Sequence, residues 1–227
     1  MALIEVHELH KHYASGAIAA QALNGVNLSI ERGDFSVLAG RSGSGKTTLL
    51  NMIGTLDRPD DGTLVVADHD VLAMTVAERA DFRLRHIGFV FQAYNLIRVL
   101  SARENVAYVL QLQGMPAKQR LAEADRLLAE VGLQGFEDRR PDQMSGGQQQ
   151  RVAVARALIS NPDIVLADEP TANLDSHTGE ALLALMRHLN EEHGVTFLVA
   201  SHDPGVIAAG RQLYRMDDGR IVSREDR

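Results

Sequence analysis

A glycine-rich run at positions 40–48, Gly-Arg-Ser-Gly-Ser-Gly-Lys-Thr-Thr, has the residue types and spacing of a phosphate-binding loop. It fits the pattern G-x-x-x-x-G-K-[ST], and it lies between a strand-like run, Phe35–Ala39, and a helical stretch. Glycines let the backbone curl so that successive N–H groups point at phosphate oxygens, and the helix N-terminus adds its positive dipole end. Lys46 is expected to reach the β- and γ-phosphates of a nucleotide, and the Thr47 hydroxyl to bind Mg²⁺. A flexible Gly/Ser turn with a chance lysine is the alternative, and the strand–loop–helix order disfavours it.

Two adjacent carboxylates, Asp168 and Glu169, follow the apolar run Ile164–Ala167. Burying Asp168 at a strand end is unfavourable unless it meets a cation, and a nucleotide-bound Mg²⁺ supplies one. Glu169, one residue further on, can polarise an attacking water, because phosphoryl transfer depends mainly on positioning and charge stabilisation. An acidic turn that caps the strand is the alternative. It loses weight because a phosphate loop stands in the same chain.

A second run of small residues, Ser145-Gly146-Gly147-Gln148, precedes the helical stretch that leads to the Asp168 strand. A serine and two glycines at a helix start form an anion-binding nest. A chain with two nests and one phosphate loop favours a head-to-tail dimer, in which each nest closes on the nucleotide of the partner. A simple loop and helix cap is the alternative.

With Met144 in front, this run resembles the signature of the ATP-binding cassette (ABC) family, in which leucine, a residue of similar volume, usually comes first. The resemblance covers essentially the whole chain and implies further roles. Gln92 corresponds to the glutamine that contacts Mg²⁺ and water, and Ala172-Asn173-Leu174-Asp175 to the loop that crosses the dimer interface. His202 corresponds to the histidine that contacts the γ-phosphate, and Tyr13 to the aromatic residue that stacks on adenine.

The sequence and the resemblance together predict ATP and Mg²⁺ as cofactors and three groups of site residues. The catalytic residues are Glu169, His202 and Lys46, and the Mg²⁺ ligands are Thr47, Gln92 and Asp168. The nucleotide-binding residues are Tyr13, Gly40, Arg41, Ser42, Gly43, Ser44, Gly45, Lys46, Thr47, Thr48, Gln92, Ser145, Gly146, Gly147, Gln148 and Asp175.

The elements that must position these residues alternate between strand-like and helical runs, which predicts a largely parallel sheet covered by helices. Strand-like runs occur at Leu3–Leu9, Leu23–Ile30, Phe35–Ala39, Ile87–Phe91, Ile164–Ala167 and Thr196–Ala200. Helical spacing occurs at Lys46–Gly54, Val76–Leu84, Arg103–Leu112, Lys118–Val131, Gly147–Ile159 and Thr178–Asn190. Asp68-His69-Asp70 is predicted to be an exposed turn.

The expected fold class is α/β, a P-loop NTPase with a RecA-like parallel-sheet core, a small antiparallel β subdomain and an inserted α-helical subdomain. The chain 1–227 is expected to form one ABC ATPase domain. Residues 1–92 and 151–227 are assigned to the catalytic core with its antiparallel subdomain, and residues 93–150, which include the signature, to the helical subdomain.

Composition restricts the class of partner. The formal net charge of −7 and the pI near 5.7 argue against binding along a nucleic-acid backbone, so no nucleic acid is expected. No apolar run approaches the ~20 residues that a membrane-spanning helix needs, and no leader is evident at the N-terminus. The absence of cysteine suits the cytoplasm. Together with these features, the resemblance to the ABC family implies a location on the cytoplasmic face of the cell membrane, with a transmembrane permease subunit contacting the helical lobe.

Finer features resemble the branch of lipoprotein-release (LolD-like) and macrolide-export (MacB-like) ATPases, with the FtsE type nearby. The relevant stretches are residues 56–62, 87–96, 104–106 and 166–176. Two residues depart from common patterns, because Arg41 stands where many relatives have proline and Ser201 where many of this branch have threonine. The branch implies export, lipoprotein release or force transmission to a membrane protein.

The predicted function is that of an ABC transporter ATP-binding subunit, which binds and hydrolyses ATP as a sandwich dimer to power a membrane partner. Three alternatives stay open at this point. They are an FtsE-like ATPase that regulates a cell-envelope complex, a soluble ABC ATPase outside transport, and a nucleotide-gated interaction module with little turnover.

Overall fold

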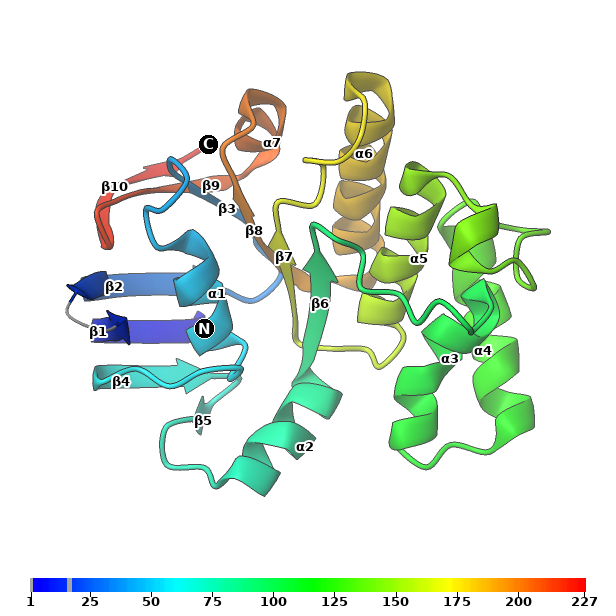
Figure 1. Cartoon of the computed structure of the whole chain (residues 1–227), viewed down its shortest axis with the longest axis horizontal. Coiled ribbons are helices and arrows are strands. Elements are labelled where there is room, and N and C mark those ends of the chain that lie inside the picture. Colours follow the sequence, from blue (N-terminus) through cyan, green and yellow to red (C-terminus); the bar gives the residue numbers. More distant parts are fainter. Residues whose placement is uncertain (1, 16–17) are drawn as a thin grey trace.

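A six-stranded, mainly parallel sheet forms the centre of the chain in the computed structural model, which describes residues 2–15 and 18–227 (Figure 1). Its strand order is β10-β9-β3-β8-β7-β6, and every neighbouring pair from β9 to β6 is parallel. Only β10 runs antiparallel to its neighbour. The strands are β3 (Phe35–Ala39), β6 (Ile87–Phe91), β7 (Ile164–Asp168), β8 (Thr196–Ser201), β9 (Gln212–Asp217) and β10 (Arg220–Asp226).

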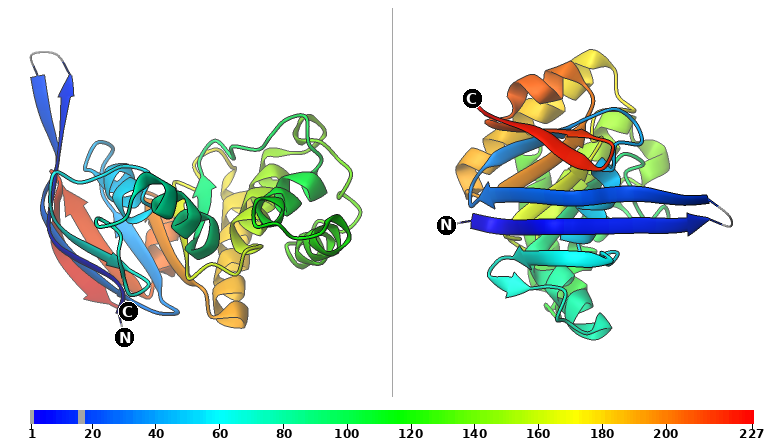
Figure 2. Two further views of the ribbon diagram at one scale, coloured as in Figure 1. Left: turned by 90° about the horizontal axis from the view of Figure 1, so that it is seen from below. Right: turned by 90° about the vertical axis from the view of Figure 1, so that its left-hand side faces the viewer.

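A second sheet, antiparallel throughout, lies beside the first in the order β2-β1-β4-β5. Its strands are β1 (Ala2–Ser15), β2 (Ile18–Glu31), β4 (Asp61–Val66) and β5 (His69–Asp70). The arms of the β1–β2 hairpin extend beyond the rest of the molecule (Figure 2). The predicted fold class, a parallel core with a small antiparallel sheet and helices, is confirmed.

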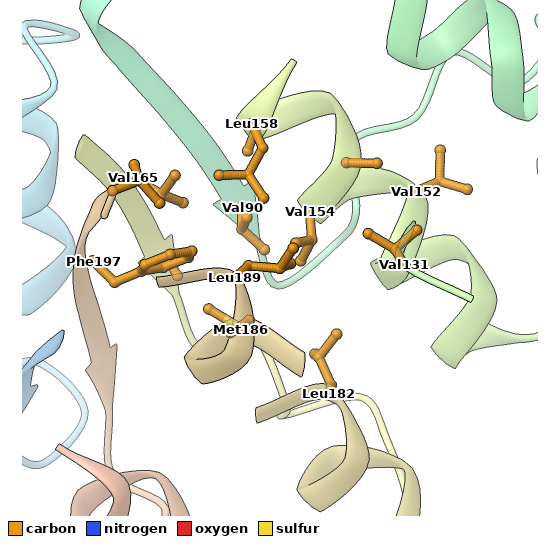
Figure 3. Packing of buried hydrophobic residues seen from close by; sticks show 14 of the residues in the cluster. Val90, Val131, Val152, Val154, Leu158, Val165, Leu182, Met186, Leu189 and Phe197 are labelled. Carbon is orange, nitrogen blue, oxygen red and sulfur yellow. The ribbon is translucent and has the colours of Figure 1, made fainter. Parts of the chain in front are cut away.

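The period of two along each central strand divides the apolar side chains between two cores. On β3, Val37 belongs to the cluster with the helices of one face, whereas Leu38 belongs to the cluster with the antiparallel sheet. On β7 and β8 the same alternation places Val165 and Phe197 in the cluster with the helices, and their apolar neighbours in the sequence in the cluster with the antiparallel sheet (Figure 3). Both faces of the parallel sheet are therefore buried, as expected for strands that read as continuous apolar runs.

Helices cover both faces. They are α1 (Lys46–Ile53), α2 (Val76–His86), α3 (Ala102–Leu112), α4 (Ala117–Glu130), α5 (Gly146–Leu158), α6 (Ser176–His193) and α7 (Pro204–Ala209), with a short 3₁₀ helix at Pro141–Gln143. Capping boxes begin α2, α3 and α5, in which Thr75, Ser101 and Ser145 accept a hydrogen bond from the third residue of the helix. Helix α1, which follows the phosphate loop, packs its buried leucines into the cluster shared by the two sheets.

Helices α3, α4 and α5 form a lobe next to the edge strand β6 (Figure 1). The contact between the lobe and the sheet is close at Gly88, where an added Cβ would lie 2.2 Å from the carbonyl oxygen of Ala157. Only glycine allows β6 and α5 to approach this closely, so the end of α5 is firmly seated on the parallel sheet.

Several elements were not predicted. The strands β4, β5, β9 and β10 and the helix α7 are absent from the sequence-based assignment, and β1 and β2 are longer than predicted. The prediction of a turn at Asp68-His69-Asp70 was wrong for its last two residues, which form β5 and pair with Val65 and Val66. The reason is that Ala67 and Asp68 both adopt positive φ, which returns the chain onto β4.

Candidate functional site: the phosphate loop and two carboxylates

The glycine-rich loop is held tightly between strand ends. A Cβ on Gly40 would lie 2.3 Å from the carbonyl oxygen of Met216, and a Cβ on Gly45 would lie 2.5 Å from that of Ala22. Gly45 also has a φ of 103°, which a residue with a side chain rarely adopts. Two glycines of the predicted motif are therefore required by packing and by backbone conformation.

Lys46 lies under this loop and is almost completely buried. Its Nζ donates hydrogen bonds to the carbonyl oxygens of Gly40 (2.7 Å) and Arg41 (3.1 Å) and lies 3.7 Å from Oε1 of Glu169. The positive charge therefore stands at the beginning of α1, where the helix dipole also favours an anion.

A hydroxyl and a carboxylate suited to Mg²⁺ lie in direct contact. Thr47 Oγ1 donates to Oδ2 of Asp168 (2.8 Å), while Oδ1 of Asp168 is buried without a hydrogen-bond partner. Burial raises the pKa of Asp168, although the hydrogen bond from Thr47 acts in the opposite direction. A buried carboxylate oxygen without a partner is unfavourable in isolation, and a divalent cation with oxygen ligands relieves that cost. The residues present therefore fit a magnesium ion.

Glu169 leaves the end of β7 in a left-handed conformation with a φ of 47°, which is uncommon for a residue with a long side chain. Its backbone N–H donates to the carbonyl oxygen of Ala200 (2.9 Å) on β8. Its carboxylate accepts from Nδ1 of His202 (2.8 Å) and from Oγ of Ser201 (3.1 Å). The backbone turn thus directs the Glu169 side chain toward Lys46 and His202.

These residues surround one open cavity of about 420 Å³. The lining contains Ala22, Ser42, Gly43, Gly45, Lys46, Thr47, Thr48, Gln92, Asp168, Glu169, Ala172 and His202. The structure therefore brings together the predicted catalytic residues, the predicted Mg²⁺ ligands and most of the predicted phosphate loop. Gly40, Arg41 and Ser44 belong to the loop but not to the lining.

Tyr13, predicted to stack on adenine, lies outside this lining on the antiparallel sheet. Its hydroxyl donates to Oδ2 of Asp57 (2.7 Å), and Nζ of Lys11 lies 5.0 Å from the centre of its ring. Burial and the neighbouring Asp57 raise the pKa of Tyr13 to about 12. The ring is partly exposed and stands near Thr48 of the loop.

The signature residues and Asp175 also lie outside the cavity. Ser145 caps α5 and exchanges hydrogen bonds with Gln148, and a Cβ on Gly146 would lie 2.8 Å from the hydroxyl of Tyr94. Asp175 caps α6, accepts from the Thr178 N–H and hydroxyl, and lines a separate cavity of about 230 Å³. A phosphate in the main cavity therefore does not meet these residues of the same chain, as the head-to-tail prediction requires.

Three residues in the site or next to it escaped the sequence-based prediction. Ser201 was noted only as a departure from a common threonine, Ala22 lines the cavity, and Gln150 is wholly buried in α5. The amide of Gln150 donates to the carbonyl oxygens of Phe91 (3.3 Å) and Pro170 (2.8 Å). An available signal was the position of Gln150 on the apolar face of a predicted helix.

Comparison with known proteins decides the family. A family model described as ABC transporter matches residues 23–172, which is more than half of the chain. This protein belongs to the ABC transporter family. The predicted enzyme class, an ABC-type ATPase, is confirmed at that level, and the fold class is confirmed by solved ABC cassettes.

One such structure, the ATP-binding cassette MJ0796 determined as a dimer bound to ADP and Pi, is 41% identical, covers 98% of both chains and superposes with a TM-score of 0.91. Among curated relatives, the macrolide export ATP-binding/permease protein MacB of Syntrophobacter fumaroxidans is 47% identical over 97% of this ABC chain. The lipoprotein-releasing system ATP-binding protein LolD of Anaeromyxobacter dehalogenans is 44% identical over 97% of it. The predicted resemblance to the LolD/MacB branch is confirmed.

The extent of these matches differs. This ABC chain spans about a third of the length of the MacB relatives, 31% in the first case, but 92% of the LolD protein. The roles of individual site residues rest on the geometry described above and stay predictions.

Proposed function

We propose that this ABC protein binds Mg²⁺-ATP in the 420 Å³ cavity and hydrolyses it as a head-to-tail dimer, in order to drive a membrane partner. The observation that carries the proposal is Asp168, whose Oδ1 is buried without a partner next to Thr47, Lys46 and Glu169. This arrangement places a cation, a metal-binding pair and a second carboxylate in one cavity.

In the proposed mechanism, Lys46 and the N–H groups of the loop hold the β- and γ-phosphates. Bound Mg²⁺, held by Thr47, Asp168 and Gln92, would neutralise charge on the phosphate oxygens. Glu169 orients the attacking water and accepts its proton, and His202 contacts the γ-phosphate. Ser145 of the partner subunit would close the site from the opposite side, since Ser145 of the chain that holds the cavity lies outside it.

We propose that the division of the chain follows the predicted one. Residues 1–92 and 151–227 then form the catalytic core, and residues 93–150 the helical subdomain that transmits closure to the partner. Gln92 stands at the junction, and its carbonyl oxygen accepts from the amide of Asn173 (2.9 Å). This bond joins the beginning of the lobe to the loop that follows Glu169.

A groove of about 680 Å³ next to this junction is the proposed docking site for a cytoplasmic helix of the membrane partner. Its walls come from α2, β6, α3 and α5, and two of its leucines, Leu56 and Leu112, are about half exposed. Of residues 94–100, which follow Gln92 into the helical lobe, only Asn95 lines it. The groove is mostly apolar, which suits an amphipathic helix.

Two arginines in this groove, Arg83 and Arg156, have no salt-bridge partner among residues 2–15 and 18–227. Arg156 donates to the carbonyl oxygens of Asn95 (2.5 Å) and Tyr94 (2.9 Å), and Arg83 donates to Thr55. Burial lowers the pKa of both guanidinium groups. A docking helix with an acidic side chain would therefore complement the groove.

Substitution at the groove tests this docking. Leu112→Glu is expected to abolish recovery of the membrane partner when a tagged Glu169→Gln chain is purified from its native cells with ATP. A charged side chain on an apolar contact surface opposes association, so the loss should be at least about tenfold. ATP hydrolysis by an isolated chain that carries Leu112→Glu alone should not change.

The control is Val222→Glu, which places the same charge at an exposed position on β10. Mass spectrometry identifies the recovered proteins. A membrane protein with few spans and a large extracytoplasmic domain supports force transmission, lipoprotein release or export. A permease with many spans moves the assignment to an ordinary transporter, and ribosomal or DNA-associated proteins alone contradict the proposal.

The proposed location is the cytoplasmic face of the cell membrane, bound through the partner. In the described residues, no helix combines the length and apolar character needed to cross a bilayer. An FtsE-like regulator of a cell-envelope complex is the second candidate within the same chemistry. It differs in the membrane protein that the purification above recovers.

The hydrolysis itself is tested with the purified chain. Phosphate release from ATP is expected to require Mg²⁺ and to stop when EDTA is added, because Asp168 and Thr47 need a cation to engage the nucleotide. Lys46→Ala should lose ATP binding as well as turnover. Unchanged hydrolysis in EDTA would contradict the assigned metal site.

A further inference from the structure

Ser201, the last residue of β8, makes a direct contact with the proposed base. It is fully buried, and its Oγ lies 3.1 Å from Oε2 of Glu169. The same oxygen lies 3.1 Å from the backbone nitrogen of Asp203. A carboxylate only accepts hydrogen bonds and an N–H only donates, so the hydroxyl must donate to Glu169 and accept from Asp203.

The two oxygens of the Glu169 carboxylate therefore have different surroundings. Oε2 faces Ser201, whereas Oε1 faces Nδ1 of His202 (2.8 Å) and Nζ of Lys46 (3.7 Å). Lys46 and His202 border the cavity, and His202 is largely exposed. Both have assigned contacts with phosphate in the proposed mechanism, and a phosphate in the cavity would compete with the carboxylate for these two groups. Ser201 belongs to a buried strand and stays in place.

We propose that Ser201 is a positioning residue, which holds Oε2 of Glu169 while Oε1 is left free to accept a proton from water. This inference rests on the proposed function, since it assigns the orientation of the base in that reaction. The hydroxyl is held from both sides, by the carboxylate and by the Asp203 N–H, so it has one orientation. A carboxylate held through one oxygen keeps the other in a fixed direction.

A purely structural role is the competing explanation. Asp203 is the N-cap of α7, and Ser201 accepts from its N–H, so loss of the hydroxyl also leaves that group unpaired. Such a defect would lower stability and act on the protein whether or not Glu169 is present. A positioning role acts only through Glu169.

The test measures steady-state ATP hydrolysis, ATP binding and thermal unfolding of the purified full chain. Ser201→Ala is expected to lower kcat about tenfold with KM and ATP affinity within about twofold of the parent values. Ser201→Thr keeps a hydroxyl and should retain most of the rate. Ser201→Val, in which a methyl group takes the place of the threonine hydroxyl, should not. This Thr/Val pair keeps the comparison decisive if the alanine variant folds poorly, because only the hydroxyl differs.

The Glu169→Gln background separates the two explanations. Adding Ser201→Ala to Glu169→Gln should leave the residual rate unchanged, since the base through which Ser201 acts is already removed. The inference would be overturned if Ser201→Ala lowered the rate in the Glu169→Gln background by the same factor as in the parent chain. Equal rates for the Ser201→Thr and Ser201→Val variants would also overturn it. If the unsubstituted chain fails to hydrolyse ATP, the proposed function itself fails. A parent-like kcat of Ser201→Ala in an active chain refutes only the role of Ser201.

Discussion

Replacing Glu169 by glutamine is expected to lower the rate of ATP hydrolysis by about 10³-fold and to trap an ATP-bound dimer. The amide has the shape of the carboxylate and still accepts from Ser201, but it cannot take a proton from the attacking water. Lys46, Thr47 and Asp168 are untouched, so ATP binding should persist. Phosphate release and size-exclusion chromatography with ATP or ADP measure the two effects.

A matched control is Glu192→Gln, the same change at an exposed position near the end of α6. It should leave both hydrolysis and oligomeric state unaltered. A Glu169→Gln protein that turns over at the parent rate would remove Glu169 from the role of base. A variant that loses hydrolysis but stays monomeric with ATP would contradict the head-to-tail closure.

Asp168→Asn is expected to abolish Mg²⁺-dependent hydrolysis while stabilising the nucleotide-free protein. Burial raises the pKa of Asp168, so at neutral pH the ionised carboxylate lowers the free energy of unfolding. An amide keeps an acceptor for Thr47 without the buried charge. The gain in free energy of unfolding should be largest at neutral pH and should vanish below the ordinary pKa of aspartate, where the carboxyl is protonated in both states.

Asp163→Asn is the opposite control. Burial alone would raise the pKa of Asp163, but hydrogen bonds from His86 and Arg32 lower it overall. Removing that charge should lower the free energy of unfolding at neutral pH, and the difference should disappear on acidification. ATP hydrolysis should remain near the parent rate because Asp163 lies at the opposite end of β7 from Asp168. Urea unfolding across pH, with and without ATP, measures both variants; destabilisation by Asp168→Asn would contradict the argument.

The central strands could be predicted because burial on both faces leaves continuous apolar runs such as Phe35–Ala39 and Thr196–Ala200. Their bounds agree with β3 and, within a residue, with β8. The strands β9 and β10 were missed although Asp218 and Gly219, both with positive φ, form a two-residue hairpin turn between them. The Asp-Gly turn could have been recognised in the sequence. Strand β10 itself is harder to recognise, because its more covered side chains lie on one face only and it contains no continuous apolar run.

The small antiparallel sheet was harder to predict. Strand β4 begins with Asp61-Gly62, residues that usually mark a turn. It forms a strand because it pairs antiparallel with β1. Pairing between residues far apart in sequence depends on the packing of the whole molecule, and local propensity does not report it.

The phosphate loop, the carboxylate pair and the signature, with the family that they indicate, could all be predicted from the sequence alone. These are local patterns, since a motif of fewer than ten residues contains the backbone conformations and side chains that its function needs. How distant segments meet depends on the tertiary structure. In the folded chain, Ser201 and His202 contact Glu169, and one buried carboxylate oxygen of Asp168 has no hydrogen-bond partner. Ser145 lies outside the cavity of its own chain. The reason is that parallel strands bring their carboxyl ends to one edge of the sheet, and the register between them sets which side chains touch.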